Sequence, residues 1–266
     1  MRIRMLAPVA LLTAGLAACT SAVPLSTPTP TPTFEPRAAA PVNTAAEIVG
    51  TWTLVDPSDG MSATITLRDS GMWEGAYECG GINGEWASLG DAFLAMSWGG
   101  DMGCIDNIDP QPSLEWVEKT ERIVASEDGW TLTDAAGAVT GSLTGGTLES
   151  EPPQDEPIQP LPQGFTVGHV EGRWAPIVET PGDSYVEFGT GVWQSSDGCN
   201  GNGGRWVDLG GGYLLATPSS ISTMIGCENV PVAEWVGAAR TAGFDDEQLV
   251  LFDSRGVELG RLIAAT

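Results

Sequence analysis

Histidine is nearly absent from this chain of 266 residues, which contains His169 and no other. One imidazole cannot build a histidine-rich metal site, and it is the only possible base for a triad that would include Ser196 and Asp197. The G-x-S-x-G turn that presents a nucleophilic serine is also missing. We therefore expect no catalytic residues, no metal and no cofactor.

Basic residues are the second shortage. Eleven Lys and Arg residues stand against 35 Asp and Glu, for a formal net charge of −24. Arg2 and Arg4 precede Cys19, so from Cys19 onward nine basic residues face the same 35 acids and the formal charge is −26. A surface this acidic makes nucleic acid an unfavourable partner. With so many acids a pair suited to glycoside hydrolysis is always available, so carboxylate pairs indicate nothing.

The first apolar run is too short to span a bilayer. Met5–Ala18 follows Arg2 and Arg4 and extends for 14 residues, which is typical of an export signal. It ends in Leu16-Ala-Ala-Cys19, which resembles the bacterial lipobox, where signal peptidase II cleaves before a lipid-modified cysteine. We expect residues 1–18 to be a lipoprotein signal peptide. Acyl chains such as palmitate on Cys19 would then anchor the protein in a bilayer. The alternative is an ordinary signal peptide.

The next segment, residues 19–46, is rich in Pro, Thr, Ser and Ala, and Thr-Pro alternate through 27–33. Such a composition cannot bury a core and predicts a disordered, extended tether. At about 3.1 Å per residue the tether could reach roughly 80 Å. The sequence therefore predicts an extracytoplasmic protein held at the cell envelope.

The remainder of the chain is a tandem duplication. Residues 73–86 and 193–206 share 5 of 14 positions at constant offset. The coinciding pairs are Trp73/Trp193, Cys79/Cys199, Gly81/Gly201, Gly84/Gly204 and Trp86/Trp206. We expect one domain over 47–148 and another over 167–266, joined by a Pro-rich linker at 149–166. Few contacts should cross that linker, so each domain should fold independently.

Alternating apolar residues and glycine-marked turns predict a mainly β fold in each repeat. Residues 63–68 alternate between Ala, Ile or Leu and Thr or Arg, and the glycines at 80–84 indicate a tight turn. One helix is predicted in each repeat, from Pro112 through Val124 and from Pro231 through Ala242. The expected count is about seven antiparallel strands and one helix per domain.

Four cysteines remain after Cys19, two in each repeat. Disulfides are the default in an exported protein, and the duplication favours pairing within repeats among three possible arrangements. The predicted bridges are Cys79–Cys104 and Cys199–Cys227. Zinc is the alternative, but neither repeat has close cysteine spacing. The acids Asp101, Asp106 and Asp109 could hold calcium, yet their spacing fits no EF-hand.

The ten tryptophans include four duplicated pairs, which favour roles in the core. An aromatic surface for glycan or peptidoglycan is the alternative. Trp98 and Trp130 have no equivalent in the other repeat and are the better candidates for exposed contacts.

The second repeat resembles the META domain, also called HslJ-like, of bacterial envelope lipoproteins. The matching pieces are Trp174, the turn of Gly198, Cys199 and Asn200, the segment with Met224 and Cys227, the helix with Glu234-Trp235, and the closing Leu249–Leu262. The first repeat is the more distant copy. The resemblance implies a small antiparallel β-barrel with one helix and an envelope or stress-related role. It implies no catalytic residues.

The sequence thus predicts a lipid-anchored envelope protein with two small β-barrel domains and a non-enzymatic binding or structural role. Its partners would be the bilayer, through acylated Cys19, and an envelope protein or glycan. The alternatives are an envelope hydrolase acting on glycan or peptide, and an inhibitor or chaperone-like partner of another exported protein.

Overall fold

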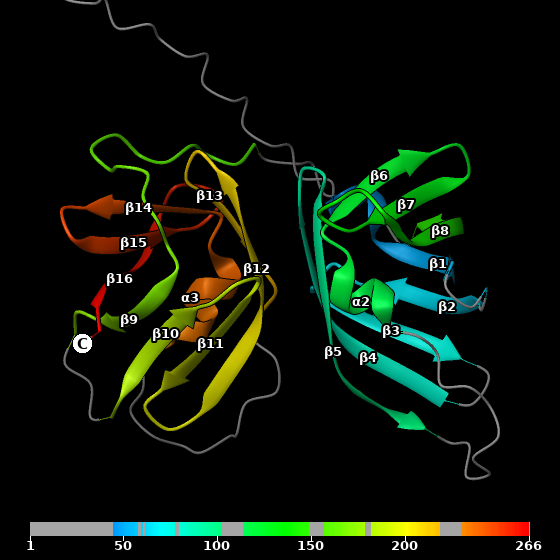
Figure 1. The fold of residues 1–266 in the computed structure, drawn as a ribbon, viewed down its shortest axis with the longest axis horizontal. Helices are drawn as coiled ribbons and strands as arrows, with labels where there is room; N and C mark the ends of the chain where they lie inside the picture. Colours follow the sequence, from blue (N-terminus) through cyan, green and yellow to red (C-terminus); the bar gives the residue numbers. More distant parts are fainter. Residues whose placement is uncertain are drawn as a thin grey trace, which may run out of the picture. The chain divides into compact units, whose positions relative to one another are not determined.

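The computed structural model describes residues 45–57, 60, 62–77, 80–102, 114–148, 157–178, 182–218 and 230–265. Strands within these ranges form two closed antiparallel barrels of eight strands each, one for each repeat (Figure 1). The mainly β fold predicted from the sequence is therefore confirmed. The predicted signal peptide at 1–18, Cys19 and the predicted tether up to residue 44 lie outside the described residues. No helix in the described ranges is long and apolar enough to cross a membrane.

The first barrel opens with the short helix α1 (Ala45–Ile48) and contains the helix α2 (Glu115–Lys119). Its strands are β1 (Gly50–Val55), β2 (Ser62–Leu67), β3 (Met72–Tyr77), β4 (Gly80–Leu89), β5 (Ala92–Met102), β6 (Arg122–Ser126), β7 (Gly129–Thr133) and β8 (Val139–Leu148). Each strand pairs with its neighbours in sequence, and β8 pairs with β1 to close the ring.

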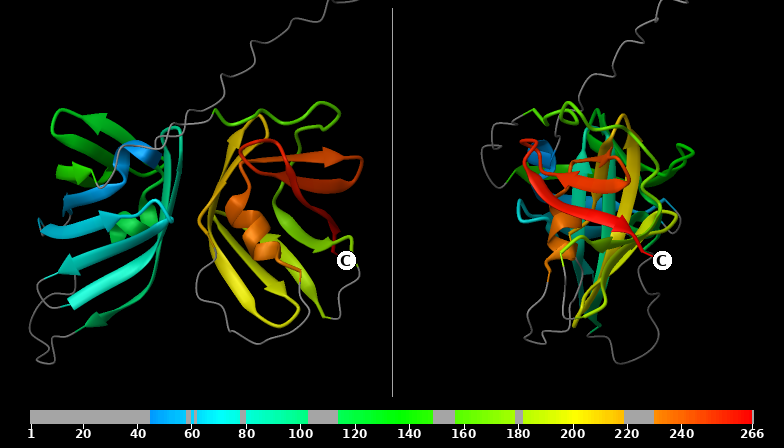
Figure 2. Two further views of the ribbon diagram at one scale, coloured as in Figure 1. Left: turned by 180° about the vertical axis from the view of Figure 1, so that it is seen from behind. Right: turned by 90° about the vertical axis from the view of Figure 1, so that its left-hand side faces the viewer.

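The second barrel repeats this order and contains the helix α3 (Val232–Ala238), which lies among the barrel strands in Figure 2. Its strands are β9 (Gly172–Pro176), β10 (Ser184–Phe188), β11 (Val192–Asp197), β12 (Gly201–Gly210), β13 (Tyr213–Ala216), β14 (Thr241–Asp245), β15 (Gln248–Phe252) and β16 (Glu258–Ala264). Pairing of β16 with β9 closes this ring.

Alternation along the strands divides the core from the surface. In β2, Ala63, Ile65 and Leu67 are buried, whereas the threonines between them are half-buried or exposed. The buried side chains of the first barrel converge on the paired rings of Trp73 and Trp116, whose centroids are 5.0 Å apart. The interior of the barrel is therefore filled by its own aromatic core.

The glycines at 80–84 do not form the predicted tight turn, because they belong to strand β4. A Cβ on Gly84 would overlap the carbonyl oxygen of Met96 on β5, and it would also meet the indole nitrogen of Trp73. Glycine at this position lets neighbouring strands and a core tryptophan approach closely. The same constraint holds at Gly204, where a Cβ would meet Trp193 and Thr217.

The predicted helices are shorter than expected, and each is followed by a strand that the sequence reasoning missed. Helix α2 ends at Lys119, and the extended backbone of Thr120 leads into β6, which contains Ile123. Helix α3 ends at Ala238 and leads into β14 in the same way. The apolar residues after each helix fit both the helical period of 3.6 residues and the strand period of two. Because these residues pair with the next strand, they adopt β structure. Each barrel therefore has eight strands rather than seven.

The linker predicted at 149–166 is partly a layer of the second barrel. Residues 149–156 lie outside the described ranges, but Ile158 and Leu161 are buried. Phe165 packs edge to face on Phe252 of β15, with ring centroids 4.9 Å apart. Apolar side chains between the prolines cover this barrel, so residues 157–165 do not behave as a free linker.

The prediction that few contacts would cross between the repeats is wrong. Residues 38–266 form one compact unit. The outward faces of β4 and β5 share an apolar cluster with those of β12 and β13, which we call the junction. Its buried members are Ala87, Leu89, Ala92, Leu94, Ile158, Tyr213 and Leu215, with Val207 and Leu209 at its margin.

The junction is built from equivalent positions in the two repeats. Ala87 lies opposite Leu94 in the β4–β5 pair, and Val207 lies opposite Leu215 in the β12–β13 pair. A β-bulge between Asp208 and Gly210 adds one residue to β12, so Ala92–Ala95 on β5 matches Tyr213–Ala216 on β13.

Candidate functional site

The turn after β11 carries the Gly-Cys-Asn motif singled out in the sequence, and its polar side chains form hydrogen bonds within the turn. The carboxylate of Asp197 accepts hydrogen bonds from the backbone N–H groups of Cys199 (2.8 Å) and Asn200 (2.6 Å). Its other oxygen accepts from Asn200 Nδ2 at 3.1 Å. Gly198 has φ +99°, a conformation that favours glycine. Asp197 and Asn200 are both buried, so this motif stabilises a turn.

Cys199 is in a disulfide, and its partner lies outside the described residues. Cys19, Cys79, Cys104, Met224 and Cys227 also lie outside them. The pairing of the cysteines therefore stays a prediction.

We expect the bridges Cys79–Cys104 and Cys199–Cys227 in the exported protein. Each would stabilise by roughly 3–4 kcal/mol, because it closes a loop of about 25 residues in the unfolded chain. Mass spectrometry of a non-reduced digest would show these two linked peptide pairs. A link between Cys79 and Cys199, or free thiols at these positions, would contradict the prediction.

The duplicated tryptophans hold equivalent places in the two barrels. Trp52 and Trp174 each donate their indole N–H to a backbone carbonyl four residues earlier, on Ile48 and Val170, at 2.8 Å. Trp86 and Trp206 similarly donate to carbonyls at the preceding hairpin. These side chains are buried, as the core interpretation predicts.

Trp98 and Trp130, the candidates for exposed contacts, are both only half-buried. Trp130 packs against the core of the first barrel. Trp98 lies at a β-bulge in β5, because Gly84 pairs with Ser97 while Asn83 pairs with Gly99. The role of these two side chains in contacts with a glycan or another partner stays a prediction.

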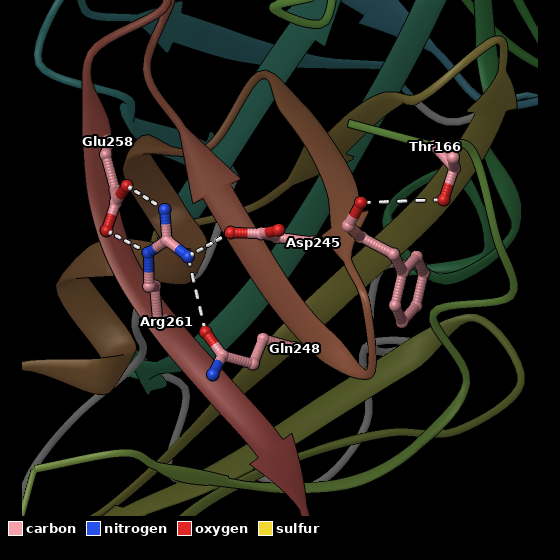
Figure 3. A network of polar contacts seen from close by, with 6 residues as sticks. Thr166, Asp245, Gln248, Glu258 and Arg261 are labelled. Carbon is pink, nitrogen blue, oxygen red and sulfur yellow. Dashed lines mark hydrogen bonds and ion pairs between the residues drawn. The ribbon is translucent and has the colours of Figure 1, made fainter. Parts of the chain in front are cut away.

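An ion-pair network on the second barrel is centred on Arg261 of β16 (Figure 3). Its guanidinium donates to both oxygens of Glu258 at 2.8 and 3.0 Å, to Asp245 at 2.6 Å and to Gln248 at 3.2 Å. Hydrogen bonds to Glu258 and Asp245 raise the pKa of Arg261 further above its usual value. The network joins β16 to the hairpin of β14 and β15, and it leaves this arginine permanently charged.

His169, considered above as a catalytic base, is a surface residue. Its side chain is 76 % exposed, and its Nε2 pairs with Glu171 at 3.2 Å. Ser196, the nucleophile considered with it, uses its hydroxyl to accept the N–H of Gly198. Within the described ranges, no group of three or more His, Cys, Asp or Glu side chains could hold a metal ion.

Arg205 of β12 is the most connected polar side chain at the junction, and the sequence analysis missed it. Its Nη1 donates to the carbonyl oxygens of Val117 (2.7 Å), Thr120 (2.9 Å) and Ala95 (3.4 Å) in the first barrel. Two of these carbonyls belong to the carboxyl end of α2, where a cation is favoured. Burial lowers the pKa of Arg205, and the carboxylates of Glu121 and Glu118 oppose that shift.

A groove of about 460 Å³ runs beside the junction. Its lining includes the apolar side chains of Leu89, Val207 and Tyr213 and the charged side chains of Asp91, Glu121, Arg122 and Asp208. The groove beside the junction therefore has a lining that is partly apolar and partly charged.

Comparison of the chain with protein-family models, with curated proteins and with solved structures finds no match. The resemblance to the META domain therefore stays an expectation from the sequence motifs.

Proposed function

We propose that the protein is a membrane-anchored envelope lipoprotein whose two META-type barrels act as a non-enzymatic binding or structural module. Acylated Cys19 would hold it in the bilayer, and the tether would carry the barrels outward on the extracytoplasmic side. The observation that carries the proposal is that the barrel interiors are packed with their own tryptophans. Recognition would therefore use the outer surface, as in an adaptor, rather than a ligand held inside a barrel.

The polar side chains of the turn after β11 also support a structural role. Asp197 and Asn200 spend their hydrogen bonds on the turn that positions Cys199, so this part of the family signature maintains the fold. The strongly acidic surface favours basic or neutral envelope partners over anionic ones.

The proposal is tested by immobilising the mature chain and applying envelope extract and purified glycan strands. As a control, the same chain is reduced and unfolded, so that composition and charge are matched. We expect the folded chain to retain a specific envelope component whose mass is unchanged. Turnover of glycan or peptide that depends on the folded chain would contradict a non-enzymatic role and favour the hydrolase alternative.

A further inference from the structure

Two equivalent positions at the junction carry opposite charges in the two repeats. Glu85 precedes Trp86 on β4, and Arg205 precedes Trp206 on β12. Glu121 follows the carboxyl end of α2 and Arg240 follows that of α3. Duplicated surfaces that keep like charges would repel each other, so this inversion suits the two repeats to each other.

Both arginines, Arg205 and Arg240, have hydrogen-bond acceptors for their guanidinium groups. Arg205 contacts three carbonyl oxygens of the first barrel, as described above. Arg240 is buried and donates to the carbonyl oxygens of Gly237 (3.0 Å) and Ala239 (2.7 Å) at the end of its own helix. In both arginines, hydrogen bonds to backbone carbonyl oxygens therefore take the place of hydrogen bonds to water.

Of the two acids, Glu85 is buried and has no hydrogen-bond or ion-pair partner among the residues that the structure describes. Its side chain is on the outward face of β4 and its residue is 9 % exposed. Met96, directly opposite on β5, contacts the hydroxyl of Thr217 in the second barrel at 3.4 Å. On the other side, a Cβ on Gly71 would lie 3.3 Å from Pro218 Cγ. Glu85 is thus enclosed where Thr217 and Pro218 meet the first barrel.

No described side chain neutralises the Glu85 carboxyl group, whose Oε2 has no hydrogen-bond partner. The charged side chains on the surrounding elements form no hydrogen bond or ion pair with Glu85. They are Arg68 before β3, Glu74 on β3, Glu118 on α2, Glu121 after α2, Arg205 and Asp208 on β12, Glu234 on α3 and Arg240 after α3. Glu74 pairs with Arg68 at 3.0 Å, and Arg205 and Arg240 donate to backbone carbonyls. A buried carboxylate without a partner is strongly disfavoured relative to the protonated acid.

We propose that Glu85 makes the packing of the two barrels pH-dependent, with a junction that is strongest when this carboxyl group is protonated and weaker once it ionises. The protonated acid suits an apolar junction, whereas the carboxylate would leave its buried Oε2 without a hydrogen-bond donor. The device would act on the extracytoplasmic side, where pH follows the surroundings of the cell.

The pH range follows from burial, which raises the pKa of Glu85 from 4.5 to about 7. The folded protein then binds a proton that the unfolded chain has lost, so stability falls as pH rises between these two values. The contribution is fully present below pH 4.5 and is lost above about pH 7. This direction is opposite to that of a carboxylate held in an ion pair.

The test is urea unfolding of the whole mature chain between pH 4.5 and 8.5, for the wild type and for Glu85→Gln. The amide resembles the protonated acid, so the variant should lack this part of the pH dependence. Relative to Glu85→Gln, the folding equilibrium constant of the wild type should fall by up to tenfold per pH unit and by about 300-fold overall. Glu127→Gln, an exposed change of equal charge, and His169→Gln should both behave as the wild type.

A second arm separates the junction from local effects in the first barrel. Arg205→Leu weakens the junction independently, so combining it with Glu85→Gln should reduce the pH-dependent difference markedly. If Glu85→Gln does not fold, Glu85→Met serves as the neutral variant of similar length. An unchanged pH profile in the neutral variant, or a pH effect of full size in the Arg205→Leu background, would overturn the proposal.

Discussion

Replacing Cys19 with alanine should move the protein completely from the membrane fraction to the soluble fraction. The anchor in our proposal is covalent lipid, and each buried methylene contributes about 0.8 kcal/mol to membrane binding. The apolar run Met5–Ala18 is too short to replace that anchor by spanning the bilayer. Fractionation of cells, with mass analysis of the amino-terminal peptide, measures both location and acylation.

The matched control for this change is Ser21→Ala, which alters the same segment but leaves the lipobox and Cys19 intact. It should remain acylated and membrane-bound. A Cys19→Ala protein that stays with the membranes after a high-salt wash would contradict the lipoprotein proposal.

The second large effect is expected at the junction. Arg205→Leu keeps an apolar stem but removes the guanidinium, so the carbonyl oxygens of Val117 and Thr120 lose their donor. Hydrogen bonds to charged groups contribute about 1.5–3 kcal/mol each, and a leucine recovers part of the loss by packing. We expect the free energy of unfolding to fall by roughly 3 kcal/mol, measured by urea denaturation at pH 6.

Arg122→Leu is the control for this prediction. Arg122 also forms a close ion pair, with Asp91 at 2.9 Å, but both side chains are more than half exposed. Exposed pairs contribute at most about 1 kcal/mol because water and salt screen them. Equal losses of stability in the two variants would contradict the role given to Arg205.

Much of the barrel architecture could be predicted from local pattern. The alternation in β2 and the repeated Trp and Gly positions gave the strands, their order and the duplication. The helices were overextended because Ile123 and Ala242 fit either period, and only pairing with β7 or β15 places them in strands. The glycines at 80–84 were assigned to a turn because their close approach to β5 and to Trp73 is a long-range contact.

The junction could not be predicted from the local sequence pattern. Its apolar positions alternate with core positions on the same strands, so β4 and β5 present apolar residues on both faces. Independent folding was predicted because the proline-rich segment resembled a spacer. One signal was available in the sequence: Glu85 and Arg205 occupy the same place in the duplication with opposite charge. Opposite charges at these positions remove the repulsion that two like-charged copies of one surface would have if they faced each other.

The most direct test of the account is urea unfolding of the mature chain at pH 6, followed by the backbone amide signals of both barrels. Ile65 in β2 and Val186 in β10 are fully buried reporters for the first and second barrel. If the junction makes the repeats one cooperative unit, both signals should disappear at the same urea concentration, and Arg205→Leu should separate them. Distinct midpoints in the wild type, unchanged by Arg205→Leu, would show two independent barrels and contradict the account.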